Sequence, residues 1–342
     1  MRHLHTSMIA SVSLCALYVV YVQIHRSHKL LKTKTLSCEK LPSVVYLFLR
    51  YVSRALTRRK GCLHDKKECK QEVFYTVNNC RLDVLLLRRF CKATGYGWDY
   101  PDSQYRDIPL CFPVFMCHKL MIMAITDDNF LLSPVGLRCV RQSIRTQQPV
   151  DELKKGPFML QVQVLLYRPV DAGVEVDVCL SAFSRHNSLV WESVVTLLSQ
   201  TKVPRAVKGA AQKEYEGEGH EVVLADAKQV DLRVPLSTGP PCPWSFFDCW
   251  VVFLPASLFG LNLRPVSSLW MLSVCLAEVE KHNGVGDVTS PVNVAVQWKD
   301  PLLAPSRVEL LFWKCPTQDL VFQMRQHSGR SKCHLMGKIS RT

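Results

Sequence analysis

The sequence predicts an α+β protein of two similar halves, each a central helix followed by antiparallel strands, with one N-terminal transmembrane helix ahead of them. Three observations predict this. Several segments of residues 109–342 alternate apolar and polar side chains, the order of one helix and four strands occurs twice, and an uncharged apolar run lies near the amino terminus. A chain of 342 residues with 48% apolar residues can fill two ordinary cores.

The apolar run covers residues 8–24 and is close to the roughly 17 to 20 residues that a membrane-spanning helix needs. Its end, Tyr21-Val-Gln-Ile24, lacks the small residues of a signal-peptide cleavage site. More basic residues follow the run than precede it, which favours a cytosolic location for the C-terminal side. The sequence therefore predicts a single-pass membrane protein whose bulk faces the cytosol, in a membrane that the sequence does not identify.

Positive charge is concentrated in the first part of the chain. Of the net charge of +14, residues 1–100 supply most, with 18 basic and 6 acidic side chains. Beside an apolar run, such a segment favours anionic lipid headgroups as the partner, at roughly 1 kcal/mol per basic residue, and argues against nucleic acid. We assign residues 1–60 to the membrane anchor and a basic juxtamembrane helix.

That juxtamembrane helix has an apolar face with helical spacing. Its members are Leu41, Val44, Val45, Phe48, Leu49, Val52 and Leu56, and Arg50, Arg54, Arg58, Arg59 and Lys60 accompany them. The pattern fits a helix lying on the membrane surface, and it equally fits the first core-facing helix of the soluble part.

The chain carries no signature of a cofactor or a metal site. Its 15 cysteines are an odd number without a Cys-x-x-Cys pair, which predicts neither a zinc site nor a disulfide framework and suits a reducing compartment. Walker-type, Gly-x-Gly-x-x-Gly and Gly-x-Ser-x-Gly motifs are also missing from the sequence. We therefore expect no cofactor and no metal, and the oligomeric state stays undetermined.

After a mixed connecting region at residues 61–108, the pattern divides the chain into a first half at 109–200, a polar linker at 201–220 and a second half at 221–342. In the first half a helix begins near residue 109 and ends before Ser133-Pro134, and strands follow at 136–146, 158–168, 174–180 and 189–199. The second half has a strand at 228–235, a helical stretch at 255–282, and strands at 291–298, 307–313, 320–326 and 332–339. A helix followed by long antiparallel strands, occurring twice, is the layout of a double hotdog, in which two antiparallel sheets each wrap a central helix.

Short motifs occur in order along both halves. They are Ser133-Pro-Val-Gly-Leu-Arg-Cys-Val140, Gln147-Gln-Pro-Val150, Leu189-Val-Trp-Glu-Ser193, Leu258-Phe-Gly260, Arg264-Pro-Val266, Leu269-Trp-Met271 and Gln297-Trp-Lys-Asp-Pro-Leu-Leu303. In these motifs residues 109–342 resemble the MaoC-like double-hotdog proteins, which include (R)-specific enoyl-CoA hydratases and acyl dehydratases. The resemblance implies acyl-thioester metabolism and an acyl-CoA ligand.

The resemblance also implies where a site should lie. The family's hydratases carry Gly-Asp-x-Asn-Pro-x-His before the second central helix, where Asp and His transfer protons and backbone N–H groups stabilise the enolate. Here the corresponding stretch is residues 246–254, with Asp248 as the candidate catalytic residue, and no histidine lies between His220 and His282. Ser267, Ser268 and Trp270, at the start of the helix, are the expected substrate-binding residues.

Three functions follow as alternatives. The hydratase residues are lost and acyl binding persists without turnover; or residues 239–252 do not represent the true sequence and the protein is an active hydratase or dehydratase; or the chain is a membrane-tethered interaction module without catalysis. A separate carboxylate pair, Asp127-Asp128, is interpreted as solvated acids at a helix end rather than an acid/base site.

Overall fold

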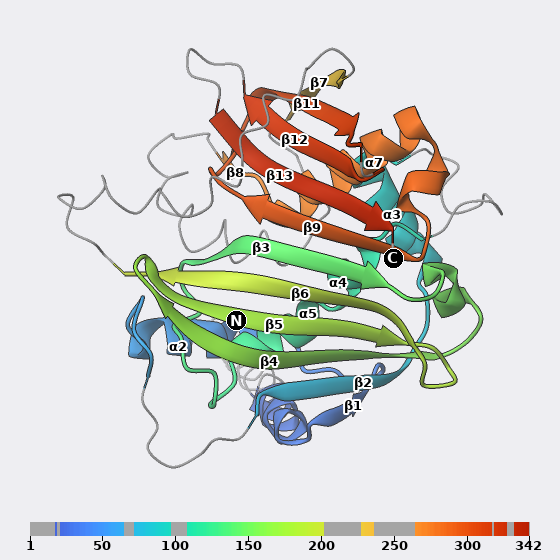
Figure 1. The fold of residues 1–342 in the computed structure, drawn as a ribbon. Helices are drawn as coiled ribbons and strands as arrows, with labels where there is room; N and C mark the ends of the chain where they lie inside the picture. The colour runs from blue at the N-terminus through green and yellow to red at the C-terminus, as the bar shows by residue number, and fades with distance from the viewer. Residues whose placement is uncertain are drawn as a thin grey trace, which may run out of the picture.

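One long curved sheet forms the framework of the protein, with the helices packed on one of its faces (Figure 1). The computed structural model describes Tyr18 and residues 21–64, 72–96, 108–201, 227–235, 264–316, 318–326 and 332–341. Within these residues, eleven strands join the sheet in the order β1-β2-β4-β5-β6-β3-β9-β13-β12-β11-β7. The expected double hotdog is confirmed, although its two halves share one sheet.

The first half contributes the strands β2, β4, β5, β6 and β3, in this order in the sheet, and the helices that pack on them. Its elements are β2 (Phe74–Cys80), α3 (Val84–Thr94), α4 (Phe112–Met116), α5 (His118–Ile125), β3 (Leu137–Thr146), the 3-10 turn Val150–Lys154, β4 (Phe158–Val170), β5 (Gly173–Phe183) and β6 (Leu189–Gln200). All pairs among these strands are antiparallel. The expected strands are therefore present, and the single expected helix is divided into α4 and α5 at Cys117.

The sheet of the first half begins earlier than the sequence indicated. β2 pairs with β4, yet it lies inside residues 61–108, which the sequence assigned to a connecting region. The ladder between β2 and β4 is irregular between Val77 and Cys80, and Asn79 adopts a left-handed φ of 56°. This irregularity breaks the period of two that marks a strand in a sequence.

The second half repeats the arrangement. Its elements are β7 (Lys228–Val234), β8 (Arg264–Pro265), α7 (Ser268–Asn283), the 3-10 turn Val285–Val288, β9 (Val292–Trp298), β10 (Leu303–Ala304), β11 (Ser306–Lys314), β12 (Leu320–Gln326) and β13 (Lys332–Arg341). The five expected strands are present, and the short strands β8 and β10 were not expected. The expectation of a helix from residue 255 is wrong for residues 264–267, because β8 pairs there with β10 and α7 begins only at Ser268. The part of the expected helix before residue 264 lies outside the described residues.

The two halves meet where β3 pairs with β9 in an antiparallel ladder from Arg141↔Gln297 to Thr146↔Val292. Each half thereby covers an edge strand that would otherwise present unpaired N–H and C=O groups. Under the second half lies α7, whose residues from Leu269 to Glu280 are all buried. The core is thus built around helices enclosed by sheet, as the hotdog layout predicts.

The N-terminal part packs against the first half. Residues 21–32 are helical, β1 (Thr35–Ser37) adds a short parallel strand beside β2, and α2 (Val44–Thr57) follows. No helix among the described residues is long and apolar enough to cross a membrane. Of the apolar run at residues 8–24, Tyr18 and residues 21–24 are described, so the predicted transmembrane helix stays a prediction.

Candidate functional site

The start of α7 is held by a short pairing of two strands. β8, just before the helix, is antiparallel to β10, with Leu303 opposite Pro265. The N–H of Val266 also donates to the carbonyl of Leu302 at 2.8 Å. The motif Gln297–Leu303 and the residues that precede α7 therefore fix one another, and they position Ser267 and Ser268 at the first turn.

Ser267 is the N-cap of α7, but its hydroxyl makes no capping hydrogen bond. By contrast, Ser43 caps α2 through the N–H of Tyr46, and Asp83 caps α3 through two backbone N–H groups. Ser267 and Ser268 are both half-buried. Ser267 therefore supplies no side-chain acceptor to the first-turn N–H groups of α7, which lie at the positive end of the helix dipole, an arrangement that suits a carbonyl or anionic oxygen.

Trp270 lies one turn further along α7 and is only 6% exposed. Its indole Nε1–H donates to the carbonyl of Ala93 at 2.8 Å, at the end of α3. Because its polar atom is engaged within the protein, this side chain ties α7 to α3. A contact of Trp270 with substrate would have to come from the ring.

The expected catalytic stretch 246–254, with Asp248, lies outside the described residues, so its role stays a prediction. Of the described histidines, His282 lies at the far end of α7, about 21 Å along the helix axis from Ser268. His334 on β13 is 2% exposed. Its Nδ1 lies 3.1 Å from the carbonyl oxygen of Asp300, and its buried Nε2 has no hydrogen-bond partner among the residues that the structure describes. Because His334 lies far from the family's motif in the sequence, no sequence pattern points to it.

A third histidine, His118, begins α5 in the first half. Its Nδ1 lies 2.8 Å from the carbonyl of Phe115, and burial lowers its pKa to about 4. This side chain is therefore neutral at physiological pH. Among the residues that the structure describes, no group of His, Cys, Asp and Glu side chains is arranged to hold a metal ion.

A small pocket lies beside the C-terminal half of α7. It is lined by residues that include Tyr96, Leu110, Leu276 and Glu280, and its volume is about 10 Å³. That volume holds about one water molecule, whereas sites for small organic ligands measure roughly 300 Å³ or more. This pocket is therefore not a site for an acyl chain.

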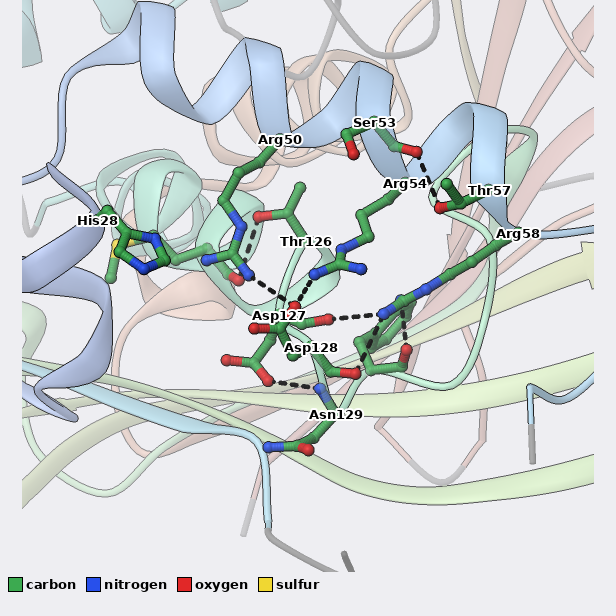
Figure 2. Close-up of polar contacts among 12 residues, drawn as sticks. His28, Arg50, Ser53, Arg54, Thr57, Arg58, Thr126, Asp127, Asp128 and Asn129 are labelled. Carbon is green, nitrogen blue, oxygen red and sulfur yellow. Dashed lines mark hydrogen bonds and ion pairs between the residues drawn. The ribbon is translucent and has the colours of Figure 1, made fainter. Parts of the chain in front are cut away.

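Asp127 and Asp128 lie directly after α5 and are both engaged (Figure 2). Asp128 pairs with Arg50 at 3.3 Å and with Arg54, and its side chain is 57% exposed. Asp127 accepts hydrogen bonds from the Tyr75 hydroxyl and, at 2.7 Å, from the N–H of Asn129. Burial and the neighbouring carboxylate raise the pKa of Tyr75 well above its usual value. These contacts favour a structural role for the pair, and its ion pairs with α2 were not foreseen from the sequence.

Arg58 fastens the same loop from the end of α2. It is 8% exposed, and burial lowers its pKa to about 10, so it stays charged at neutral pH. Its guanidinium donates to four backbone carbonyls, those of Asp127, Asp128, Phe130 and Leu132. The sequence signal was the spacing of four between Arg50, Arg54 and Arg58, which placed them on one side of the helix without showing that this side faces inward.

Neither a family profile nor a curated protein matches this sequence. Solved structures match it in fold. HtdX of Mycobacterium tuberculosis aligns with a TM-score of 0.58 and 16% identity over 79% of this chain and all of its own. A MaoC-like dehydratase from Phytophthora capsici aligns with a TM-score of 0.55 and 12% identity over 85% of this chain and 98% of its own.

A longer protein shares part of this architecture. Peroxisomal multifunctional enzyme type 2 from Drosophila melanogaster aligns with a TM-score of 0.50 and 12% identity over 79% of this chain and 48% of its own. At such low identities the likeness concerns the fold. The uncapped helix start at Ser267 thus lies in a chain that has the double-hotdog fold of the MaoC-like dehydratases.

Proposed function

We propose that this protein binds an acyl thioester, with the thioester carbonyl at the N-terminal end of α7, and that it lacks the hydratase chemistry of the family it resembles. The observation that carries the proposal is the uncapped first turn of α7, fixed by β8 and β10 in a double-hotdog fold. Fatty acyl-CoA metabolism is the area in which such a ligand belongs.

Binding and turnover make different demands on this site. A thioester carbonyl gains from backbone N–H donors and from the helix dipole, both of which the start of α7 offers. Hydration needs, in addition, one group to activate water and another to protonate the substrate carbon. The sequence offers Asp248 alone in the expected stretch, and an aspartate does not readily perform both transfers.

A proline substitution tests the binding site with little risk to the fold. Ser268 is the first helical residue, where proline is well tolerated, and Ser267 already has the extended backbone (φ −62°, ψ 135°) that a residue before proline prefers. Ser268→Pro removes one first-turn N–H, whereas Ser268→Ala keeps it. By calorimetry with octanoyl-CoA, we expect Ser268→Pro to weaken binding by about tenfold relative to Ser268→Ala. Equal affinities would refute this placement of the carbonyl.

An active enoyl-CoA hydratase or dehydratase is the second candidate. It is favoured because β8, α7 and β10 are all formed, and they follow the stretch 239–252 in which the family's motif is missing. The full-length protein should be assayed for crotonyl-CoA hydration by the loss of enoyl-thioester absorbance, with Asp248→Asn as the control. Hydration that depends on Asp248 would replace the proposal of lost activity. Sequencing the transcript across codons 239–252 would show whether the family motif is present.

Attachment to a membrane through residues 8–24, with the bulk in the cytosol, remains our proposal from the sequence. It is supported by the apolar run and by the excess of basic residues after it. Carbonate extraction and protease protection of the protein in cells would test it. If neither acyl-CoA binding nor hydration is measurable, the interaction-module alternative is favoured.

A further inference from the structure

α2 packs on the protein through the side that carries its arginines. Its buried apolar residues are Tyr46, Leu47 and Tyr51, and its arginines point to the same side. The apolar stripe, for which the sequence left a core-facing and a membrane-facing interpretation open, is exposed: Val44 51%, Val45 63%, Phe48 36%, Leu49 45% and Leu56 82%. At about 100° per residue, these side chains fall within an arc of about 140°. We refer to these five residues as the outer face of α2.

The contacts of Arg50, Arg54 and Arg58 fix this orientation. Figure 2 shows the three side chains projecting from α2 towards the loop that follows α5. Turning the helix so that the outer face packs inward would separate Arg58 from the four carbonyls that it satisfies and would break the ion pairs with Asp128. Because buried carbonyls without donors are costly, the exposure of the outer face is built into the fold.

Exposed cations lie on both sides of α2 in the sequence. Arg26, Lys29 and Lys32 on the preceding helix and Arg59 and Lys60 after α2 are all exposed. Between residues 21 and 64 the only acidic residue is Glu39. The surface therefore combines apolar side chains with positive charge, and it has little to repel an anionic partner.

The preceding helix, residues 21–32, is fastened to the start of α2. The N–H of Ser43 donates to Ser27 Oγ at 3.1 Å, and His28 Nδ1 lies 2.9 Å from the Tyr46 hydroxyl. On this preceding helix, Tyr21 is 66% exposed. Residues 21–24, the described end of the apolar run, therefore lie on a helix that is joined to the start of α2.

From this geometry we propose that the outer face of α2 is a docking surface for an anionic lipid bilayer. The apolar residues would enter the boundary between headgroups and acyl chains, and the exposed lysines and arginines would meet the headgroups. A second copy of this chain is a less suitable occupant, because it would bring two positively charged surfaces together. This surface is separate from the proposed acyl site, so either proposal can fail alone.

The proposal changes which basic residues contact lipid. Arg50, Arg54 and Arg58 are directed inward, so they stabilise the fold and leave headgroup contacts to Arg26, Lys29, Lys32, Arg59 and Lys60. The two interpretations of this helix from the sequence are thereby reconciled. One side of α2 packs on the protein, and the other exposes Val45, Leu49 and Leu56.

Hydroxyl-radical footprinting of the full chain measures the exposure of these side chains directly. On vesicles of phosphatidylcholine and phosphatidylserine, we expect oxidation of Phe48, Leu49 and Leu56 to fall about fivefold relative to the lipid-free protein. Leu165 on β4 and Leu303 on β10, which are 47% and 42% exposed, serve as controls and should not change. Unchanged oxidation of the outer face on vesicles would overturn the proposal. Protection that grows with protein concentration without lipid would also overturn it, because a second copy would then be the occupant.

Charge-matched variants separate apolar docking from simple attraction. Val45→Glu with Leu49→Glu places two charges on the outer face, and Ser53→Glu with Thr57→Glu places two on exposed polar positions of the same helix. In full-length protein bound to vesicles, Val45→Glu with Leu49→Glu should abolish the protection of Phe48 and Leu56 from oxidation. The same pair should weaken the affinity for vesicles about tenfold. The second pair should change either readout less than about twofold. Equal effects of both pairs would overturn the proposal. A lower Tm for the first pair alone would also overturn it, because another part of the chain would then cover the face.

Discussion

The two halves of the sheet enclose their helices in different ways. In the first half the central helix is divided into α4 and α5, and its C-terminal end is fastened by Arg58 and Tyr75. In the second half α7 is one helix of 16 residues, and its N-terminal end is left without a side-chain cap. The central helices of the first half also begin without a side-chain cap, at Cys111 and Cys117, so the difference lies in the fastened C-terminal end of α5. The comparison teaches that the first half is reinforced by side-chain contacts at the end of its central helix.

Removing the largest buried side chain of the first half should have the largest effect. Trp191 on β6 is fully buried, and its Nε1–H donates to the carbonyl of Leu110 at 2.9 Å. We expect Trp191→Ala to lower the free energy of unfolding by about 4 kcal/mol, measured by urea denaturation. Tyr21→Ala, at a 66% exposed aromatic residue, is the control and should be neutral. A small loss in the free energy of unfolding for Trp191→Ala would contradict the interpretation of the first half as a reinforced scaffold.

Arg58 tests whether the first half depends on its fastened loop. Arg58→Lys keeps the charge but cannot reproduce a planar fork of donors for four carbonyls. We expect a loss of about 3 kcal/mol in the free energy of unfolding. The neighbouring Arg59→Lys, at an exposed arginine, supplies the matched comparison. Similar stabilities for the two variants would show that the carbonyls find other donors.

Gly337 tests the packing of the second half. A Cβ at this position of β13 would lie 2.2 Å from Cζ of Phe322, which is fully buried on β12. Gly337→Ala should therefore cost about 2 to 3 kcal/mol through overpacking, and adding Phe322→Leu should recover part of the loss. Gly286→Ala, where the nearest atom is 3.6 Å away, is the control for glycine replacement. Thermal denaturation of the parent protein, Gly337→Ala, Phe322→Leu and the double variant measures the coupling.

His118 should make the first half sensitive to acid. Its pKa falls from 6.5 to about 4 on burial, so the unfolded chain binds a proton more readily than the folded one between these pH values. Stability should therefore rise with pH across this window and fall by about 2 kcal/mol as pH drops from 6.5 to 4. His118→Gln should flatten this part of the profile, as measured by urea denaturation across pH. An unchanged slope would contradict the assignment.

The N-caps of α3 and α7 provide the smallest and most direct contrast. Asp83 accepts hydrogen bonds from the N–H groups of Leu85 and Leu86, whereas Ser267 caps nothing. Asp83→Ala should lower the free energy of unfolding by about 1 kcal/mol, and Ser267→Ala should leave it unchanged within about 0.3 kcal/mol. A stability loss for Ser267→Ala would imply that its hydroxyl serves the helix rather than a ligand.

The sequence predicted the strands of both halves because their side chains alternate, as at Val292, Val294 and Val296 on β9, which are all buried. It missed β2, where the irregular pairing at Asn79 interrupts that alternation. It also could not decide which side of α2 is buried, because the side that packs inward is made of Tyr46, Tyr51 and arginines, whose polar atoms find partners only in the folded protein. The spacing of apolar residues shows that a helix has two different faces. The carbonyl and carboxylate groups that accept hydrogen bonds from the arginines of α2 decide which face packs on the protein.

For the site, the resemblance to the family placed Ser267 and Ser268 at a helix start, which the structure has at Ser268, whereas the apolar pattern alone extended the helix back to residue 255. The sequence could not show that Ser267 leaves the helix uncapped or that the Trp270 indole is bonded to Ala93, since both facts depend on contacts between segments far apart in the chain. Asp248 lies outside the described residues, so its catalytic role stays a prediction from the family's motif.

The ladder between β3 and β9 bears on how a substrate could reach the interior. Six residue pairs from Arg141 to Thr146 join the two halves edge to edge. The halves therefore cannot separate without breaking the backbone hydrogen bonds of this ladder. Access to the interior therefore does not come from separation of the two halves at this ladder. For the same reason, a fragment that contains one half alone would expose β3 or β9 as an unpaired edge strand, which would favour pairing with a second copy of the fragment.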